Sequence, residues 1–481
     1  MASVKSYKFG DPGTPKFPDD FEILKKAVLQ VTDLKTNHNK YYGLELHEGK
    51  VKGALVYRVF THYGRTDDLE TNPNAGQKEV RFAATRAEAE GLYREIYGEK
   101  TSARKGYKEL ALASSKIGSG KARGTSSGAV DAKTIAKIEA GKAAGAAPAP
   151  AVKRSELQPA LAALVKYLYD EATEALTTTV QAKITAEGIE TPLGVLTIGQ
   201  IEKGEAILDE LYDHFKKKTA SRAMMESLSS DFYTMIPHRI GRSRAMVDAA
   251  VIDTLEEFHQ KQETLQLMKD MLQVNGDKGT VLYDSQLDGK YDALKCELGP
   301  LERTNPTWQE VADLVQKSQL RTRTIRVQSV YSVKRPVEHA AFAAGVPNQR
   351  LLFHGSRIKN WVGILSRGIL LPKIVVSLGV NRTDAGWLGS GIYFGDASCT
   401  SAGYTSPGRP GTRFLAVTRV ALGNVKDFTK ITYGLSAPPA GFHSCHGVRA
   451  RPGVTSQFAD DEYVIYDSRQ QRLEYLVEFK M

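Results

Sequence analysis

Near the N-terminus, apolar and polar residues alternate in two neighbouring stretches, NKYYGLELHEG and ALVYRVFTHYGR, with a Gly-containing turn between them. A period of two places apolar side chains on one face of a strand, so the two stretches predict a β-hairpin. The later stretch RAEAEGLYREIYGEK has the spacing of a helix with its charges on the outer face. These patterns predict a small α+β module over residues 1–110.

A helical pattern dominates residues 155–275. Its first apolar face begins at Leu161, Leu164 and Leu168. Thr197, followed three residues later by Gln200, forms a capping-box pattern ahead of a second apolar face. A further helical pattern runs over residues 246–272. We therefore expect an all-α bundle here.

From residue 276 onward, short runs of β-branched and aromatic residues replace the helical pattern: TIRVQSVYSV, RFLAVTRVAL, EYVIYD and RLEYLVEFK. In the last run, apolar residues at every second position share one face. This pattern predicts a sheet-rich α+β domain over residues 276–481. The whole chain is then an α+β multidomain protein.

Residues 111–154 are rich in Ala, Gly, Ser and Lys and contain no aromatic residue. Such a segment buries too little apolar area to offset its ordering entropy, which predicts a flexible tether. It carries eight basic and two acidic residues, a large share of the formal net charge of +10. A basic excess near the N-terminus favours a polyanion partner such as nucleic acid, although a merely solvated linker has the same composition.

Three cysteines, far apart and without a C-x-x-C pair, support neither a disulfide framework nor a structural zinc site. We interpret the neighbouring Cys445 and His446 as ordinary loop residues and expect no metal. An intracellular location follows from the cysteine usage. No apolar run is long enough for a membrane helix, and residues 1–20 lack the order of a signal peptide.

Unusual residues gather in LLFHGSR (351–357) and GSGIYFGDASCTSAGY (389–404). Gly lets main-chain groups approach a ligand closely, and Tyr393 and Tyr404 could sandwich a flat heteroaromatic ring. A planar ligand with an amide group suits this combination. A Rossmann site is disfavoured, because Gly389, Gly391 and Gly395 give G-x-G-x-x-x-G rather than G-x-G-x-x-G, and no P-loop motif occurs.

The segments HGSR, GSGIYFGD followed by SAGY, and DEYVIYD resemble the three signature segments of the poly(ADP-ribose) polymerase catalytic domain, in the same order. TPLGVLTIGQIEKGEAIL and SSDFYTMIPH resemble the helical regulatory domain of that family. NKYYGLELHEG with THYGR resembles its WGR module. The resemblance covers nearly the whole chain except the tether.

The resemblance implies that NAD+ is the substrate and that His354, Tyr393 and Glu462 form a catalytic triad. His354 would hydrogen-bond the adenosine ribose, and Glu462 would hold the 2′-hydroxyl of the nicotinamide ribose. Further contacts to NAD+ would come from Gly355, Ser356, Asn360, Ser401 and Tyr404. Departure of nicotinamide gives an oxocarbenium-like transition state, which a fixed carboxylate stabilises. Glu462 could also act as general base toward the acceptor.

Two positions depart from the pattern of polymer-forming members. Thr400 stands where these often have Lys, and Leu370 stands where several have an adenosine-contacting Arg; Arg382 could replace that Arg. The run 369–391 is longer than in the best-known nuclear members and resembles the vault-associated branch. We expect protein ADP-ribosylation, self-modification included, with elongation to poly(ADP-ribose). Transfer of single units, or a non-catalytic DNA-binding scaffold, remain the alternatives.

The WGR signature here is Tyr63-Gly64-Arg65, and it implies contacts of Tyr63 and Arg65 with DNA ends or nicks. The helical domain would shield the NAD+ site until DNA loosens it, with Glu263 near the adenosine. The tether, with Ser114, Ser115 and flanking Lys residues, is a candidate target of automodification. We expect a nuclear protein if the source is eukaryotic and a cytoplasmic one otherwise.

Overall fold

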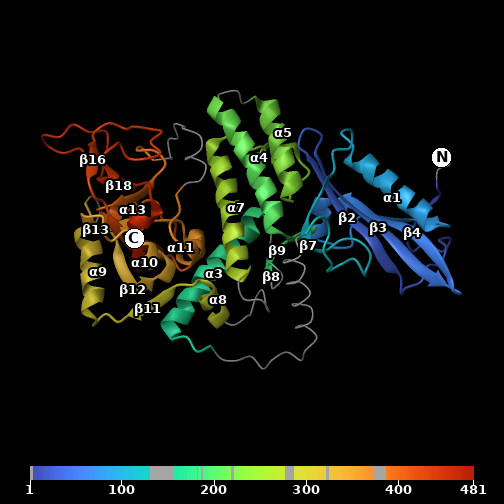
Figure 1. The fold of residues 1–481 in the computed structure, drawn as a ribbon, viewed down its shortest axis with the longest axis horizontal. Coiled ribbons are helices and arrows are strands. Elements are labelled where there is room, and N and C mark those ends of the chain that lie inside the picture. The colour runs from blue at the N-terminus through green and yellow to red at the C-terminus, as the bar shows by residue number, and fades with distance from the viewer. Residues whose placement is uncertain are drawn as a thin grey trace. The chain divides into compact units, whose positions relative to one another are not determined.

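The computed structural model describes residues 4–130, 155–180, 183–185, 188–217, 221–276, 287–320, 324–371 and 386–481. It divides into two compact units. The first contains Met1–Pro150 and Leu176–Tyr283, and the second contains Ala151–Ala175 and Asp284–Met481. Each unit mixes helices and sheets (Figure 1), as the sequence predicted.

An antiparallel six-stranded sheet with one helix forms the N-terminal part of the first unit. Its strands, in spatial order, are β1 (Ser6–Lys8), β5 (Gln77–Ala83), β4 (Ala54–Arg65), β3 (His38–Val51), β2 (Glu22–Asp33) and β6 (Lys108–Glu109). The predicted hairpin is β3 and β4, joined by Lys52 and Gly53. Both residues have positive φ, as a two-residue hairpin turn requires. The helix α1 (Arg86–Thr101) begins with a capping box formed by Thr85 and Glu88.

The first half of the predicted tether is folded, which corrects that prediction for residues 111–130. Strand β7 (Leu112–Ser115) pairs with β10 (Gly194–Leu196), and the sheet continues through β9 (Gly188–Thr191) and β8 (Lys183–Thr185). The Oγ of Ser119 donates to Glu45 across 2.5 Å, so a buried carboxylate anchors the loop. Composition alone did not reveal this, because the anchor lies 74 residues away. Residues 131–154 lie outside the described residues.

Helices make up most of the remainder of the first unit: the end of α3 (Pro159–Val180), α4 (Ile198–Lys217), α5 (Arg222–Met235), α6 (Arg244–Asp248) and α7 (Leu255–Gly276). The strands β8, β9 and β10 show that this region is not all-α. The predicted helix over residues 246–272 is interrupted between α6 and α7. Thr254 and Glu257 form a capping box at the start of α7, which explains the break.

A nine-stranded sheet dominates the second unit. Its spatial order is β11 (Glu297–Leu301), β12 (Arg326–Lys334), β19 (Gln471–Lys480), β15 (Arg413–Ala421), β13 (Gln349–Gly355), β14 (Ile392–Gly395), β18 (Glu462–Ile465), β17 (Ser444–Gly447) and β16 (Val425–Phe428). The helices are the first part of α3, α8 (Leu287–Ala293), α9 (Pro306–Lys317), α10 (Pro336–Ala341), α11 (Trp361–Arg367) and α13 (Ser398–Ala402). Of the strand pairs that the structure describes in this sheet, all except β16 with β17 are antiparallel.

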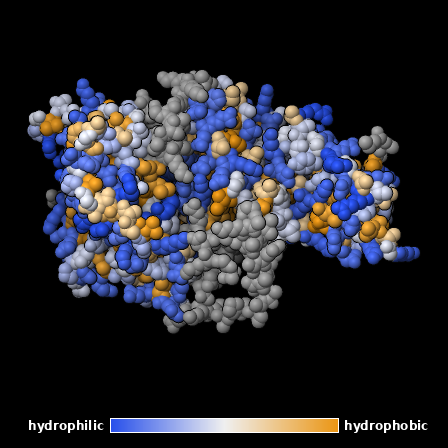
Figure 2. Space-filling model, in the orientation of Figure 1, coloured by the Kyte–Doolittle hydropathy of each residue, from blue (hydrophilic) through white to orange (hydrophobic). Residues whose placement is uncertain are grey.

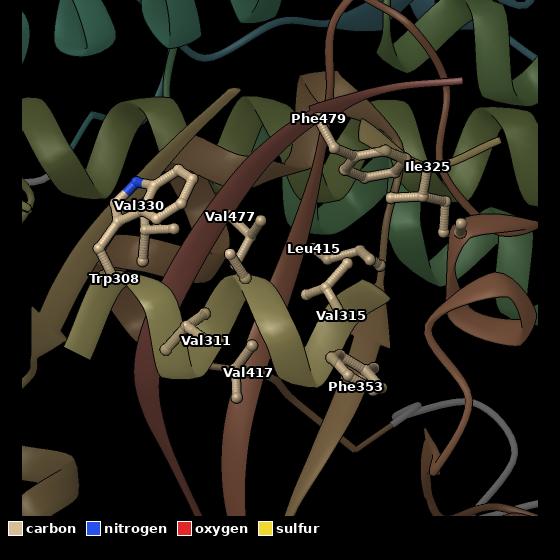
Figure 3. Packing of buried hydrophobic residues seen from close by; sticks show 12 residues of the cluster. Trp308, Val311, Val315, Ile325, Val330, Phe353, Leu415, Val417, Val477 and Phe479 are labelled. Atoms are coloured by element: carbon tan, nitrogen blue, oxygen red, sulfur yellow. The ribbon is translucent and has the colours of Figure 1, made fainter. Parts of the chain in front are cut away.

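The core of this sheet forms under α9. Val311 and Val315 of the helix pack in one buried cluster with Leu415 and Val477 of the central strands (Figure 3). Phe353 of β13 belongs to the same cluster and is fully buried. Burying a side chain of this size contributes roughly 1.5–3 kcal/mol. The core therefore fixes the strand that leads directly into His354 and Gly355.

On the face shown in Figure 2, hydrophobic residues form small patches set among hydrophilic ones. Among the helices that the structure describes, none combines the length and apolar character needed to cross a membrane.

Candidate active site

A cavity of about 360 Å³ lies in the second unit, where β13, β14 and β18 approach α13. Strand β14 lies between the other two, with Gly395 opposite both Phe353 and Glu462. Segments more than 100 residues apart in the sequence thereby share one site. The lining residues are His354, Gly355, Gly386, Trp387, Tyr393, Phe394, Gly395, Thr400, Ser401, Tyr404 and Glu462.

His354 is oriented by the strand beside it. Its Nδ1 lies 3.0 Å from the main-chain oxygen of Tyr393, so Nδ1–H donates and Nε2 is left as an acceptor. Burial lowers the pKa of His354, and the Tyr393 carbonyl opposes this effect. A neutral imidazole with its Nε2 lone pair available can accept a hydrogen bond from a sugar hydroxyl.

Glu462 is the carboxyl group among the residues that line the cavity. Burial, and secondly the negative charge of Asp460, raises the pKa of Glu462 to about 7. A desolvated carboxylate is a strong partner for positive charge that develops in a bound substrate. A carboxyl group that titrates near neutrality is also suited to proton transfer.

Gly355 is required by a close main-chain approach. A Cβ at Gly355 would overlap the carbonyl oxygen of Ser401. The Oγ of Ser401 donates to the main-chain oxygen of Phe353 across 2.9 Å, which ties α13 to β13. Gly355 lines the cavity without a side chain, so a planar carboxamide could approach its main chain closely.

The hydroxyl of Tyr393 is fixed within the loop that precedes β14. It donates to the oxygen of Gly389 across 2.8 Å and accepts from the N–H of Leu388 across 2.9 Å. Gly386, at a φ of 68°, lies so close to the ring that a Cβ there would overlap it. Burial raises the pKa of Tyr393, so the phenol stays neutral. The Tyr393 ring therefore gives the cavity a rigid surface, and its hydroxyl does not act as an acid.

Tyr404 and Thr400 are lining residues whose side chains are available for contacts with a ligand. Tyr404 is 65% exposed although it lines the cavity, so its ring is available to cover a ligand. The Oγ1 of Thr400 is buried and has no hydrogen-bond partner in the structure. Such a hydroxyl is costly unless a bound molecule satisfies it.

Other sequence-predicted residues lie outside this lining. The Nδ2 of Asn360 donates to the Oγ of Ser356 across 3.1 Å, and neither side chain lines the cavity. Leu370 is 41% exposed. Arg382 lies outside the described residues.

Comparison with known proteins gives three matches along the chain. Residues 306–481 match the poly(ADP-ribose) polymerase catalytic domain, residues 155–303 the poly(ADP-ribose) polymerase regulatory domain, and residues 25–113 the WGR domain. The catalytic match contains every residue that lines the cavity. The chain belongs to the poly(ADP-ribose) polymerase family.

Curated members of the family show how far the similarity extends. The chain is 34% identical over 289 residues to protein mono-ADP-ribosyltransferase PARP4 of Mus musculus, covering 60% of this chain and 14% of that protein. It is 25% identical over 506 residues to poly [ADP-ribose] polymerase 1 of Arabidopsis thaliana, covering 96% and 47%. For human poly [ADP-ribose] polymerase 2 the values are 29% over 323 residues, 60% and 53%. The chain thus spans only part of the length of these polymerases and transferases.

In the WGR domain, the two predicted DNA-contacting residues already have partners. The hydroxyl of Tyr63 donates to Glu79 across 2.6 Å, and its ring stacks on Tyr42 at 5.3 Å. Arg65 pairs with Asp67 across 2.7 Å and donates to the main-chain oxygen of Gly241 across 2.5 Å. Arg65 therefore joins the WGR sheet to the segment between α5 and α6.

Both residues line a groove of about 1400 Å³ between the WGR sheet and α5, within the first unit. Exposed cations rim this groove, among them Lys35, Lys40, Arg104 and Lys105. These cations were not predicted from the sequence, because they come from segments far apart along the chain and show no motif.

Sequence reasoning also missed Gly386, Trp387 and Phe394 in the cavity. A local signal existed in GWLGSG, where an aromatic residue stands between glycines just before the recognised GSGIYF segment. Cys445 and His446 lie in strand β17, which corrects the loop interpretation. His446 contacts Asp427 across 2.9 Å and Asp461 across 2.8 Å.

Within the described residues, no cluster of three or more His, Cys, Asp or Glu side chains could hold a metal ion. Glu263 is half-buried on α7, and its role near adenosine stays a prediction. Ser114 and Ser115 are 7% and 1% exposed, so they are not accessible to modification in this fold.

Proposed function

We propose that this protein transfers ADP-ribose from NAD+ to protein side chains and releases nicotinamide. The observation that carries the proposal is the buried Glu462 in one cavity with His354 and Tyr393. The family membership and the names of the relatives reported above support the same reaction class.

In this reaction the bond between C1′ of the ribose and the pyridinium nitrogen breaks, and its electron pair leaves with neutral nicotinamide. An acceptor oxygen or nitrogen forms the new bond to C1′ and gives up a proton, which the Glu462 carboxylate can take. Glu462 also stabilises the positive charge on the ribose in the transition state. Tyr393 and Tyr404 would hold the ring, and Gly355 would pair with the carboxamide.

For the product, a specific observation favours single ADP-ribose units over polymer. None of the cavity-lining residues that the structure describes is Lys or Arg, and Thr400 presents a neutral hydroxyl. A growing poly(ADP-ribose) chain carries pyrophosphate charges that cationic side chains would favour. Polymer formation, which we expected from the sequence, is the alternative outcome.

We further propose that DNA stimulates the reaction through the groove lined by Tyr63 and Arg65. Phosphates would be attracted to Lys35, Lys40 and Arg104 at the rim. They would also compete for Arg65 and weaken its contact with Gly241. DNA would thereby favour a state in which the regulatory segment is released.

The decisive experiment measures NAD+ consumption and nicotinamide release with and without nicked DNA. We expect Glu462→Gln to lower turnover by about 100-fold or more, since electrostatic and general-base contributions are both lost. Glu302→Gln, an exposed residue of the same compact unit, is the matched control. Undiminished turnover in Glu462→Gln would refute the mechanism, and no turnover in the wild-type chain would favour the scaffold. Gel analysis of the labelled product separates single units from polymer.

A further inference from the structure

The first part of α3 packs within the second unit, although residues 155–303 match the regulatory domain. Its contacts converge on the loop of residues 405–412. This loop follows Tyr404 directly and leads into β15. The helix α3 therefore contacts the segment next to Tyr404, which lines the candidate NAD+ site.

Tyr167 is the first contact. Its hydroxyl accepts from the Oγ1 of Thr412 across 3.1 Å and donates to the main-chain oxygen of Thr412 across 3.3 Å. Its ring lies 5.8 Å from that of Phe414. Gly408 makes room for the phenol, since a Cβ there would overlap the tyrosine. The loop and the helix fit each other closely at this point.

Glu171, one turn further along, is the second contact. Glu171 is 8% exposed, and its carboxylate accepts the main-chain N–H of Arg409 across 2.8 Å. The Arg409 guanidinium lies 3.4 Å from Glu171 and 2.9 Å from Glu174. A charged acceptor that is buried and bonded to a main-chain N–H restrains the loop more strongly than an exposed ion pair.

The other side of the loop is held by the catalytic domain itself. Arg413 donates to the main-chain oxygen of Thr405 across 2.5 Å, and Ser406 accepts the N–H of Ile358 across 3.1 Å. Thr405 also lies beside Gly355, the residue expected to pair with the carboxamide. Loosening the α3 side would leave Tyr404 attached to a loop held at one side only.

We propose that Tyr167 and Glu171 are positioning residues for the active site: they hold the loop 405–412 so that Tyr404 covers the nicotinamide ring. This inference rests on the proposed NAD+ site. It gives the start of the regulatory region a supporting role, so that this helix assembles the substrate site rather than only shielding it.

The test uses the full chain and measures nicotinamide binding by calorimetry together with the KM for NAD+. We expect Tyr167→Phe and Glu171→Gln to weaken nicotinamide binding by about 2- to 30-fold, the range for residues that act on a site through a packed network. The KM for NAD+ should rise by a similar factor, while kcat at saturating NAD+ changes less. Asp170→Asn is the matched control, because it lies on the same helix in an exposed ion pair with Lys166.

Hydrogen exchange at Arg409 tests the clamp independently of any ligand. In Glu171→Gln the amide of Arg409 should exchange faster than in the wild-type chain and in Asp170→Asn. Faster exchange with unchanged nicotinamide binding would overturn the proposal, and so would tighter binding, which would indicate a purely shielding helix. If the wild-type chain fails to bind nicotinamide, the proposed function is lost, and the exchange at Arg409 still decides whether α3 holds the loop.

Discussion

The Nδ1–H of His354 donates to the main-chain oxygen of Tyr393 across 3.0 Å, so the first two residues of the predicted triad are joined through the backbone. This bond crosses between β13 and β14 and selects one tautomer of the imidazole. The Nε2 atom is then an acceptor by geometry, and the orientation of His354 depends on a residue 39 positions away.

His354→Gln is expected to raise the KM for NAD+ by about 10-fold, because one hydrogen bond to the substrate is lost or misaligned. Since burial lowers the pKa of His354, the imidazole stays neutral from pH 8 down to its ordinary pKa of 6.5. His354 should therefore add no pH dependence to the KM over that range. Steady-state kinetics across pH 6 to 8.5 checks this, with the exposed His443→Gln as control.

The raised pKa of Glu462 predicts an acidic limb in kcat/KM for NAD+. With the carboxyl group titrating at about 7, activity should rise as the pH increases through that value. Asp460→Asn removes a repulsive charge and should shift the limb to lower pH. A limb that stays in place in this variant would show that burial alone sets the pKa.

The same shift predicts a change in stability. The pKa of Glu462 is higher in the folded chain than its ordinary 4.5, so its contribution to stability is fully present below pH 4.5 and is lost as the pH rises through 7. Glu462→Gln should therefore raise the free energy of unfolding at pH 8 by at most about 3 kcal/mol. At pH 4.5 the gain should vanish. Urea unfolding of both proteins at the two pH values measures it.

The chemistry of the cavity was largely predictable from local motifs. His354, Gly355, Tyr393, Ser401 and Glu462 each stand in a short recognisable segment, and the strand order brings those segments together. Trp387 was missed because its role depends on a loop that folds back over Tyr393. Alternation likewise predicted β3 and β4, although the residues in the middle of both strands are buried on both faces.

What could not be predicted depends on contacts between distant residues. The side chain of Gln200 was expected to complete a capping box, but it accepts the N–H of Ala111 and donates to the oxygen of Met235. The Oγ1 of Thr197 does cap Gln200 N, so only half of the motif forms. A sequence pattern describes one helix end, whereas main-chain groups of Ala111, just before β7, and of Met235 in α5 compete for the same side chain.

Gly355→Ala is expected to abolish nicotinamide binding and to lower the free energy of unfolding by about 1–3 kcal/mol, because the new Cβ would meet the Ser401 carbonyl. Gly345→Ala is the control, since nothing lies within 4 Å of its added Cβ. Calorimetry and urea unfolding measure the two effects. Normal binding in Gly355→Ala would mean that the main chain of β13 does not contact the ligand.

Arg65→Ala tests whether the contact between the WGR sheet and the segment after α5 restrains the enzyme. Two outcomes of losing Arg65 are linked: the bond to Gly241 disappears, and so does a cation in the groove. We therefore expect activity without DNA to rise, while the additional stimulation by nicked DNA falls by about 10-fold or less, as for one hydrogen-bonded charge.

Lys40→Ala separates the two effects, because it removes an exposed cation from the groove and leaves the bond between Arg65 and Gly241 in place. It should weaken DNA binding and reduce its salt dependence, since one phosphate contact is removed, and leave the activity without DNA unchanged. NAD+ consumption titrated with nicked DNA at two salt concentrations distinguishes the variants. If Arg65→Ala behaved like Lys40→Ala, the bond to Gly241 would have no part in restraining the enzyme, and Arg65 would serve only to attract DNA.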